Sequence, residues 1–100
     1  MLVGGYPLDK YPLSDMLAFM SDLAVAVGER IKSARVSLGI TGAELARRAG
    51  IGVHVLWRYE HGQMLPGLEN LVALARELGV SVDDLALKAD TEPVIVSKAG

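Results

Sequence analysis

The chain of 100 residues contains no cysteine, which excludes disulfide bonds and metal sites built on thiolates. Aromatic residues account for only 5% of the chain, although 51% of it is hydrophobic. Its core must therefore consist mainly of Ala, Val, Leu and Ile, which suits a compact helical protein better than a β-sandwich. At this length we expect one small all-α domain.

Two further absences concern membranes and catalysis. No apolar run approaches the roughly 18 residues of a membrane span, and residues 1–15 lack the basic start and apolar stretch of a signal peptide. We therefore expect a cytoplasmic protein with no membrane partner. His54 and His61 have no nearby carboxylate cluster that resembles a metal site, and no nucleophile, base and orienting group converge by spacing. The sequence thus predicts no enzyme, no metal and no other cofactor.

The chain also lacks an excess of positive charge, since its net charge is −2. Proteins that bind nucleic acid usually carry a basic total, so the location of the charge matters. Residues 27–62 contain six cations and three carboxylates, hence +3, whereas the remaining residues sum to −5. The six cations are Arg30, Lys32, Arg35, Arg47, Arg48 and Arg58. If these cations lie together on one face, their placement favours a DNA-binding function. If they are scattered over the surface, a function in binding another protein is favoured instead.

A helical period begins at Leu13, after an irregular arm over residues 1–12. Apolar residues recur at alternating spacings of four and three, which is typical of one face of a helix. The members of this stripe are Leu13, Leu17, Met20, Ala24, Val27, Ile31, Ala34 and Leu38. Gly28 interrupts it at a cost of about 1 kcal/mol relative to Ala, so either one helix covers 14–38 or two helices meet near Gly28. Gly39 then has the position of a left-handed C-cap.

Two short helices follow, separated by a turn. Thr41 and Glu44 form a capping box for the first, in which Thr41 caps the helix and Glu44 reaches back. Gly50 can supply the positive φ that a turn requires, and Ile51 can anchor that turn in the core. The second helix covers about 53–61. A helix, a short turn with glycine and a helix have the geometry of a helix-turn-helix.

The stretch LENLVALARELGV predicts a further helix, which Gly79 ends. Ser81 and Asp84 make a second box-like start for a short helix. Val94, Ile95 and Val96 could make a short strand, which needs a partner from elsewhere.

Four segments carry a family resemblance through their order and spacing, namely TGAELARRAGI, WRYEHG, Pro66 and LENLVALARELGVSVDDL. Together they resemble the phage-repressor/Cro-like helix-turn-helix family, also called XRE-like, over residues 27–85. The resemblance implies a five-helix repressor-like domain over 27–87, with an arm and an extra N-terminal helical segment over 1–26 and a short C-terminal tail over 88–100. It also implies a sequence-specific transcription regulator that binds double-stranded DNA, with the recognition helix at about 53–61 in the major groove.

Carried onto these positions, the resemblance pairs Arg35 with Glu60 in a structural ion pair that fixes the angle of the recognition helix. It implies core positions at Leu45, Ala49, Leu56, Tyr59, Leu71, Leu74 and Leu78. The DNA-binding set is Thr41, Gly42, Gly52, Val53, His54, Trp57, Arg58, His61 and Gln63. Only Arg58 among them suits a bidentate contact with guanine. Gly42 stands where the family often has Gln, which leaves backbone N–H groups and the helix dipole for a phosphate.

Leu13, Leu17 and Met20 lie outside the segment that fills the family's own core. They need another partner, and a second copy of the chain is the economical choice. We therefore expect a homodimer that uses these three residues for dimerisation.

A function of a different class remains open. The same fold can serve as a protein-interaction module, for example an antitoxin or a partner-binding regulator. Its surface would be the apolar face of Val53, Val55 and Trp57, extended by Met64 and Leu65, because aromatic and Met side chains are enriched in interface cores. Trp57 either belongs to this outer face or folds back over the domain's own core.

Overall fold

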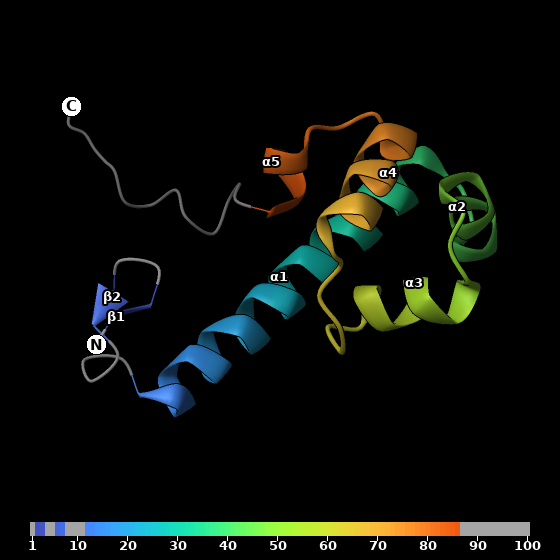
Figure 1. The fold of residues 1–100 in the computed structure, drawn as a ribbon. Coiled ribbons are helices and arrows are strands. Elements are labelled where there is room, and N and C mark those ends of the chain that lie inside the picture. The colour runs from blue at the N-terminus through green and yellow to red at the C-terminus, as the bar shows by residue number, and fades with distance from the viewer. Residues whose placement is uncertain (1, 4–5, 8–11, 87–100) are drawn as a thin grey trace.

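The computed structural model describes residues 2–3, 6–7 and 12–86, and it is helical apart from its first residues (Figure 1). Its helices are α1 (Leu13–Leu38), α2 (Gly42–Ala49), α3 (Val53–Glu60), α4 (Leu68–Leu78) and α5 (Val82–Ala86). The predicted five-helix all-α fold is confirmed. Within the arm expected to be irregular, β1 (Leu2–Val3) pairs antiparallel with β2 (Tyr6–Pro7), since Val and Tyr favour strands. The predicted tail over 88–100, with its possible strand, lies outside the described residues.

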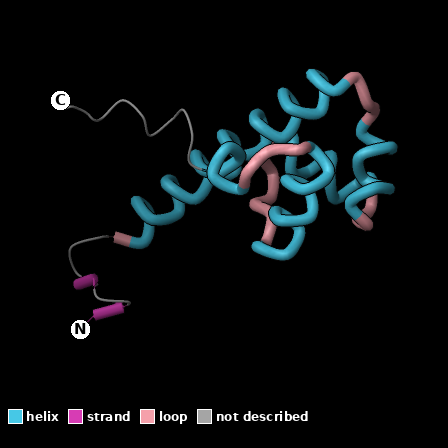
Figure 2. Tube along the Cα trace, turned by 90° about the horizontal axis from the view of Figure 1, so that it is seen from above, coloured by secondary structure: helices cyan, strands magenta, loops and turns pink. Residues whose placement is uncertain are grey.

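Helix α1 supports the other helices along only part of its length. Its buried residues all lie between Ala24 and Ile31, and it contacts α3, α4 and α5. The N-terminal half projects away from the rest of the helices (Figure 2). Although α1 has 26 residues, neither it nor any other helix within 12–86 is apolar enough along its length to cross a membrane.

Gly28 lies inside α1, which continues through it as one helix rather than two. The residue is buried, and a Cβ placed on it would overlap the carbonyl oxygen of Tyr59 and lie 3.1 Å from the carbonyl carbon and oxygen of Glu60. The absence of a side chain therefore lets the C-terminal end of α3 pack directly on α1. This close approach offsets the cost of glycine in a helix, which is about 1 kcal/mol relative to Ala.

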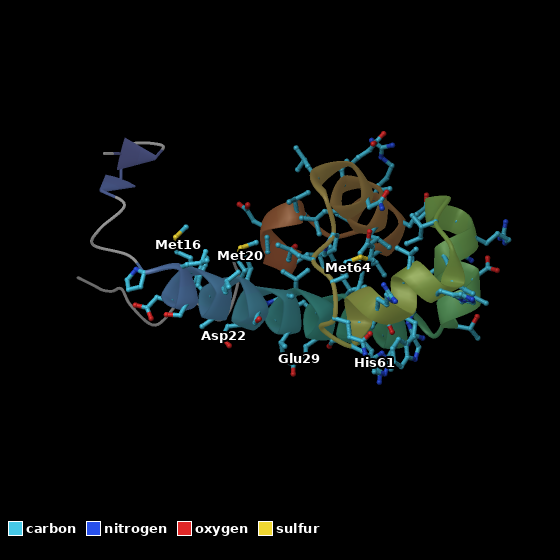
Figure 3. The ribbon with its side chains drawn as sticks, turned by 60° about the horizontal axis from the view of Figure 1, so that its bottom comes forward. Met16, Met20, Asp22, Glu29, His61 and Met64 are labelled. Carbon is cyan, nitrogen blue, oxygen red and sulfur yellow. The ribbon has the colours of Figure 1, made fainter. Side chains whose placement is uncertain are left out.

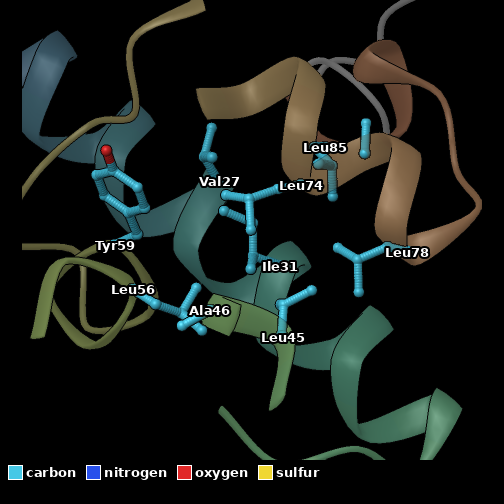
Figure 4. Close-up of a cluster of buried hydrophobic side chains, with 10 residues drawn as sticks. Val27, Ile31, Leu45, Ala46, Leu56, Tyr59, Leu74, Leu78 and Leu85 are labelled. Carbon is cyan, nitrogen blue, oxygen red and sulfur yellow. The ribbon is translucent and has the colours of Figure 1, made fainter. Parts of the chain in front are cut away.

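The core lies between α1 and the four shorter helices and is aliphatic except for one tyrosine (Figure 4). Its buried members are Val27, Ile31, Leu45, Ala46, Leu56, Tyr59, Leu74, Ala75, Leu78 and Leu85. The predicted core positions Ala49 and Leu71 are partly buried and pack against this cluster. Leu38, expected to continue the stripe, is exposed. It lies in the last turn of α1, and Ile40, just after that turn, packs on the core instead.

The turn between α2 and α3 depends on Gly50, which has φ of 74°. The N–H of Gly50 donates to the carbonyl of Arg47, and that of Ile51 donates to the carbonyl of Ala46. This is the Schellman pattern, which needs a left-handed residue at the helix end. Ile51 then packs against the core, so the predicted turn chemistry is confirmed. Gly39 ends α1 in the same way, with φ of 72°.

Thr41 caps α2 as predicted, because its hydroxyl accepts a hydrogen bond of 3.1 Å from the N–H of Glu44. The second half of the predicted box is wrong. The Glu44 carboxylate accepts hydrogen bonds from Arg47 and Arg48, since side chains three and four residues apart are neighbours on a helix surface.

Both halves of a capping box form at α5. The N–H of Asp84 donates to the hydroxyl of Ser81, and the N–H of Ser81 donates to the Asp84 carboxylate, each at 3.0 Å. Gly79 ends α4 just before this box, as expected. Helix α4 therefore ends, and α5 begins, where the sequence predicts, while the expected continuation of α5 to Leu87 lies outside the described residues.

Candidate nucleic-acid interface

Helices α2 and α3 form the helix-turn-helix unit, and their inner faces hold it to the core. Leu45 and Ala46 of α2 are buried, as are Leu56 and Tyr59 of α3. The two helices contact each other, and α3 also contacts α1. This packing leaves the other side of α3 facing solvent.

The outer face of α3 carries four side chains that line one open hollow. They are Val53, His54, Trp57 and Arg58, all of which are exposed. The hollow combines an apolar surface with one guanidinium and one imidazole. Arg58 can present two parallel N–H donors, and a valine can contact the methyl group of thymine. The structure therefore brings together four of the predicted DNA-binding residues.

Trp57 does not fold back over the core, and half of it is exposed. Its indole stacks on the imidazole of His61, with ring centroids 3.8 Å apart and an angle of 16° between the planes. Nδ1 of His61 lies 2.9 Å from the carbonyl oxygen of Trp57. Because a carbonyl oxygen can only accept, Nδ1 carries the hydrogen of this bond. The stack fixes the indole and extends the outer face to the end of α3.

The remaining predicted contacts lie at helix ends. Gly52 is the exposed N-cap of α3, and no side chain caps that helix. Gly42 begins α2 and is half-buried behind the exposed Thr41. Gln63 is exposed in the loop that follows α3. The first N–H groups of α3 therefore have no side-chain partner, which is the arrangement that suits an anion.

An ion pair joins the last residue of α3 to α1. Nε of Arg35 donates to Glu60 at 2.7 Å, and its Nη2 donates to the other carboxylate oxygen at 3.0 Å. The two side chains are 14% and 6% exposed. The hydrogen bond to Glu60 raises the pKa of Arg35, and Nη1 also donates to the carbonyl of Ile40. The pair expected from the resemblance is therefore present, largely shielded from water.

A second polar contact holds α3 from the side of α4. Nδ2 of Asn70 donates to the hydroxyl of Tyr59 at 2.8 Å. Sequence reasoning missed this contact, because a single asparagine in a helix has no period or spacing that marks it. Sequence reasoning also missed the close approach at Gly28, because the backbone that lies against it belongs to Tyr59 and Glu60, about 30 residues later in the chain.

Of the six cations of residues 27–62, only one lines the hollow on α3, and Lys32 is exposed on α1. Arg30 donates to the carbonyl of Leu85 in α5, and Arg35 is engaged with Glu60. Arg47 and Arg48 both donate to Glu44, and these bonds lower the pKa of Glu44 to about 2. Arg58 lies in the hollow on α3. The outer face of α3 is therefore only weakly basic.

The apolar surface proposed for a protein partner is smaller than the sequence indicated. Val55, Met64 and Leu65 are partly buried and pack against the core, so they do not extend the outer face of α3. Val53 and Trp57 remain exposed. The prediction of a broad apolar face is wrong, because Val55 lies on the inner side of α3, one residue before the buried Leu56.

The comparisons with known proteins agree with this geometry. The helix-turn-helix family matches residues 31–85. The cryptic phage CTXphi transcriptional repressor RstR of Vibrio cholerae is 37% identical over 59 residues, which are 59% of this chain and 53% of that repressor. Multiprotein-bridging factor 1 of Candida albicans is 32% identical over 78 residues, which are 78% of this chain and 52% of that protein. The chain therefore spans about half the length of these two relatives.

A solved structure shows the same likeness. The P22 c2 repressor, crystallised in complex with synthetic operator 9T, is 33% identical to this chain and superposes with a TM-score of 0.61. The likeness covers 63% of this chain and 96% of the repressor chain. The family match spans more than half of the chain and includes the whole of the helix-turn-helix unit. This chain belongs to the helix-turn-helix family.

Proposed function

We propose that this protein is a sequence-specific regulator of transcription that binds double-stranded DNA, with α3 in the major groove. The observation that carries the proposal is the outer face of α3. That face presents a hollow of Val53, His54, Trp57 and Arg58, while its inner face is held by the core and by the Arg35–Glu60 pair. The likeness to RstR and to the P22 c2 repressor supports the same reading.

The side chains divide between reading bases and holding the backbone. Arg58 matches the O6 and N7 acceptors of guanine, and Val53 matches the methyl group of thymine. His54 can donate to a base acceptor or a phosphate. The uncapped N–H groups that begin α3 after Gly52 can hold a phosphate. Because few cations support these contacts, base-specific contacts carry an unusually large share of the affinity.

A homodimer completes the proposal. Leu13, Leu17 and Met20 are exposed on α1, and a second copy would cover them. Dimeric regulators bind two half-sites related by a two-fold axis.

Selection of bound duplexes from a random pool tests the proposed function. An enriched sequence with two related half-sites supports it. Arg58→Ala should then weaken binding by roughly 1–3 kcal/mol and relax the preference at one base pair. Arg47→Ala is the control, because Arg47 is exposed on α2 and paired with Glu44. If no sequence is enriched, or if the loss of Arg58 changes neither affinity nor preference, α3 does not read DNA and a protein partner becomes the better explanation.

The salt dependence of binding gives an independent measure. Each phosphate neutralised by the protein should contribute roughly −0.9 to the slope of log affinity against log salt concentration. A salt-insensitive affinity for duplex DNA would contradict the phosphate contacts proposed at the helix ends.

A further inference from the structure

The N-terminal half of α1 carries an apolar stripe that nothing in the described part of the chain covers. Leu13, Met16, Leu17 and Met20 are 69%, 45%, 54% and 52% exposed. At 3.6 residues per turn they lie on the same side of α1 as the buried Ile31. The stripe is therefore the core-facing side of α1 continued beyond the helices that cover it (Figure 2).

We propose that two copies of this chain pair their α1 helices antiparallel through this stripe, and that the length of the arm sets the distance between the two recognition helices. The proposal rests on the DNA-binding function and adds the mode of pairing and the spacing of the half-sites. For convenience the four residues Leu13, Met16, Leu17 and Met20 are called the arm stripe.

The charge of the arm decides between a second copy and a lipid surface. Asp15, Asp22 and Glu29 are seven residues apart and exposed, so they lie on one side of α1, opposite the arm stripe. Figure 3 shows Met16 and Met20 projecting from one side and Asp22 and Glu29 from the other. Residues 12–26 contain no cation. A helix that binds anionic lipid needs Lys or Arg on its polar face, whereas paired arms would keep their carboxylates in solvent, away from the seam.

The stripe is self-complementary about its centre. A two-fold axis between Met16 and Leu17 places Leu13 of one copy opposite Met20 of the other, and Met16 opposite Leu17. All four side chains of each copy are then covered. Two stripes in contact would bury on the order of 1,000 Å², which is at the small end of specific interfaces. We therefore expect a dimer that dissociates on dilution and that is stabilised when both copies bind one duplex.

The same axis places both α3 helices on one side of the dimer. Val25 and Gly28 of α1 lie close to the C-terminal end of α3. A Cβ on Gly28 would meet Tyr59, and a Cβ on Gly62, just after α3, would meet Val25. At about 100° per residue, Val25 and Gly28 lie roughly a quarter turn around α1 from the arm stripe. The two-fold axis that relates two antiparallel α1 helices is perpendicular to both helices. It is also perpendicular to the line along which the two stripes face each other. It therefore preserves the side on which α3 lies.

The arm length matches the repeat of DNA. From the proposed axis to Gly28 is a distance of about 17 Å along α1, at a rise of about 1.5 Å per residue. The α1 residues that contact the C-terminal ends of the two α3 helices are then about 35 Å apart. From that end α3 runs away from the N-terminal half of α1 (Figure 1), so the outer faces of the two α3 helices are spaced on the order of one helical turn of DNA or somewhat more. We therefore expect half-site centres roughly one helical turn of DNA apart, about 10 base pairs or slightly more.

Cysteine cross-linking tests the pairing directly, because the natural chain has no cysteine. Disulfides require Cα atoms within about 7 Å. Under oxidising conditions a mixture of Leu13→Cys and Met20→Cys chains should give a cross-linked dimer containing one of each. Each variant alone should give little, because residues 13 and 20 would be about 10 Å from their own copies along the seam. Asp22→Cys is the control on the opposite side of α1.

Each outcome decides the proposal. Cross-linking of each variant with itself, with no dimer containing one of each from the mixture, would show parallel arms and overturn it. So would a monomeric mass by sedimentation of the natural chain at all concentrations, as expected if residues 87–100 of the same chain cover the stripe. Far-UV circular dichroism confirms that the variants stay helical. If the chain does not pair but still selects single half-sites from the random pool, the pairing proposal fails and the DNA-binding proposal stands. If the chain pairs but has no affinity for duplex DNA, the DNA-binding proposal fails and the pairing proposal stands.

Discussion

Replacement of Gly28 by alanine tests whether the close approach of α1 and α3 fixes the recognition helix. The new Cβ would overlap the carbonyl oxygen of Tyr59 and crowd the carbonyl group of Glu60. Both obstacles are backbone, so α3 must move, by on the order of 1 Å, rather than a side chain. Overpacking of this kind costs about 1–3 kcal/mol, and a backbone obstacle favours the upper end. The gain in helix propensity is about 1 kcal/mol in the opposite direction.

The net effect expected for Gly28→Ala is a loss of about 2 kcal/mol in the free energy of unfolding, or roughly 8–16 °C in Tm for a domain of this size. Urea unfolding followed by circular dichroism at 222 nm measures it. Gly42→Ala is the matched control, because a Cβ there would meet only a Leu56 methyl at 3.9 Å. We expect it to be neutral or slightly stabilising. A Gly28→Ala chain as stable as the natural one, or more stable, would refute the close approach as the reason for the glycine.

Two further predictions concern ion pairs. Arg35→Ala leaves the Glu60 carboxylate, 6% exposed, without its partner and should cost about 3–5 kcal/mol of unfolding free energy in urea. Replacing both residues by Met should cost less than Arg35→Ala alone, and an equal or greater loss would contradict the shielded pair. Glu44 has its pKa lowered from 4.5 to about 2, so its pairing stabilises the fold above pH 4.5 and is lost as the pH falls toward 2. The Tm of Glu44→Gln should therefore be lower than that of the natural chain at pH 6, and the difference should vanish as the pH falls through 2, whereas a constant difference would exclude this ion pair as the cause.

Local patterns were enough to predict most of the helices. The spacing of apolar residues predicted α1. The glycines and the apolar residues that follow them predicted where α1, α2 and α4 end. These signals succeed because a helix end depends on its own few residues. Leu38 shows where the same reasoning fails. Periodicity gives the side of the helix on which a residue lies, but not how far along that helix its partners extend.

Contacts between distant segments were less accessible from the sequence. The Arg35–Glu60 pair followed from a family resemblance and not from spacing. For Gly28, local reasoning indicated only the cost of a glycine inside a helix, since nothing nearby in the sequence shows that Tyr59 lies against it. The outer face of α3 was only partly predicted, because the patterns did not show that Val55 faces the core. The Glu44 carboxylate could either accept a hydrogen bond from the backbone of Thr41 in a capping box or pair with Arg47 and Arg48. The local sequence allows both uses and does not decide between them.

The continuity of α1 restricts how the chain can change its reach. Each residue inserted into the N-terminal half lengthens that rod by about 1.5 Å and also turns everything before it by about 100°. A single insertion therefore swings the exposed leucines and methionines away from the face that they now share. Additions of about seven residues, two nearly complete turns, nearly restore their direction, and each lengthens the rod by about 10 Å. Relatives with longer arms of this kind should therefore differ in whole steps rather than by small increments.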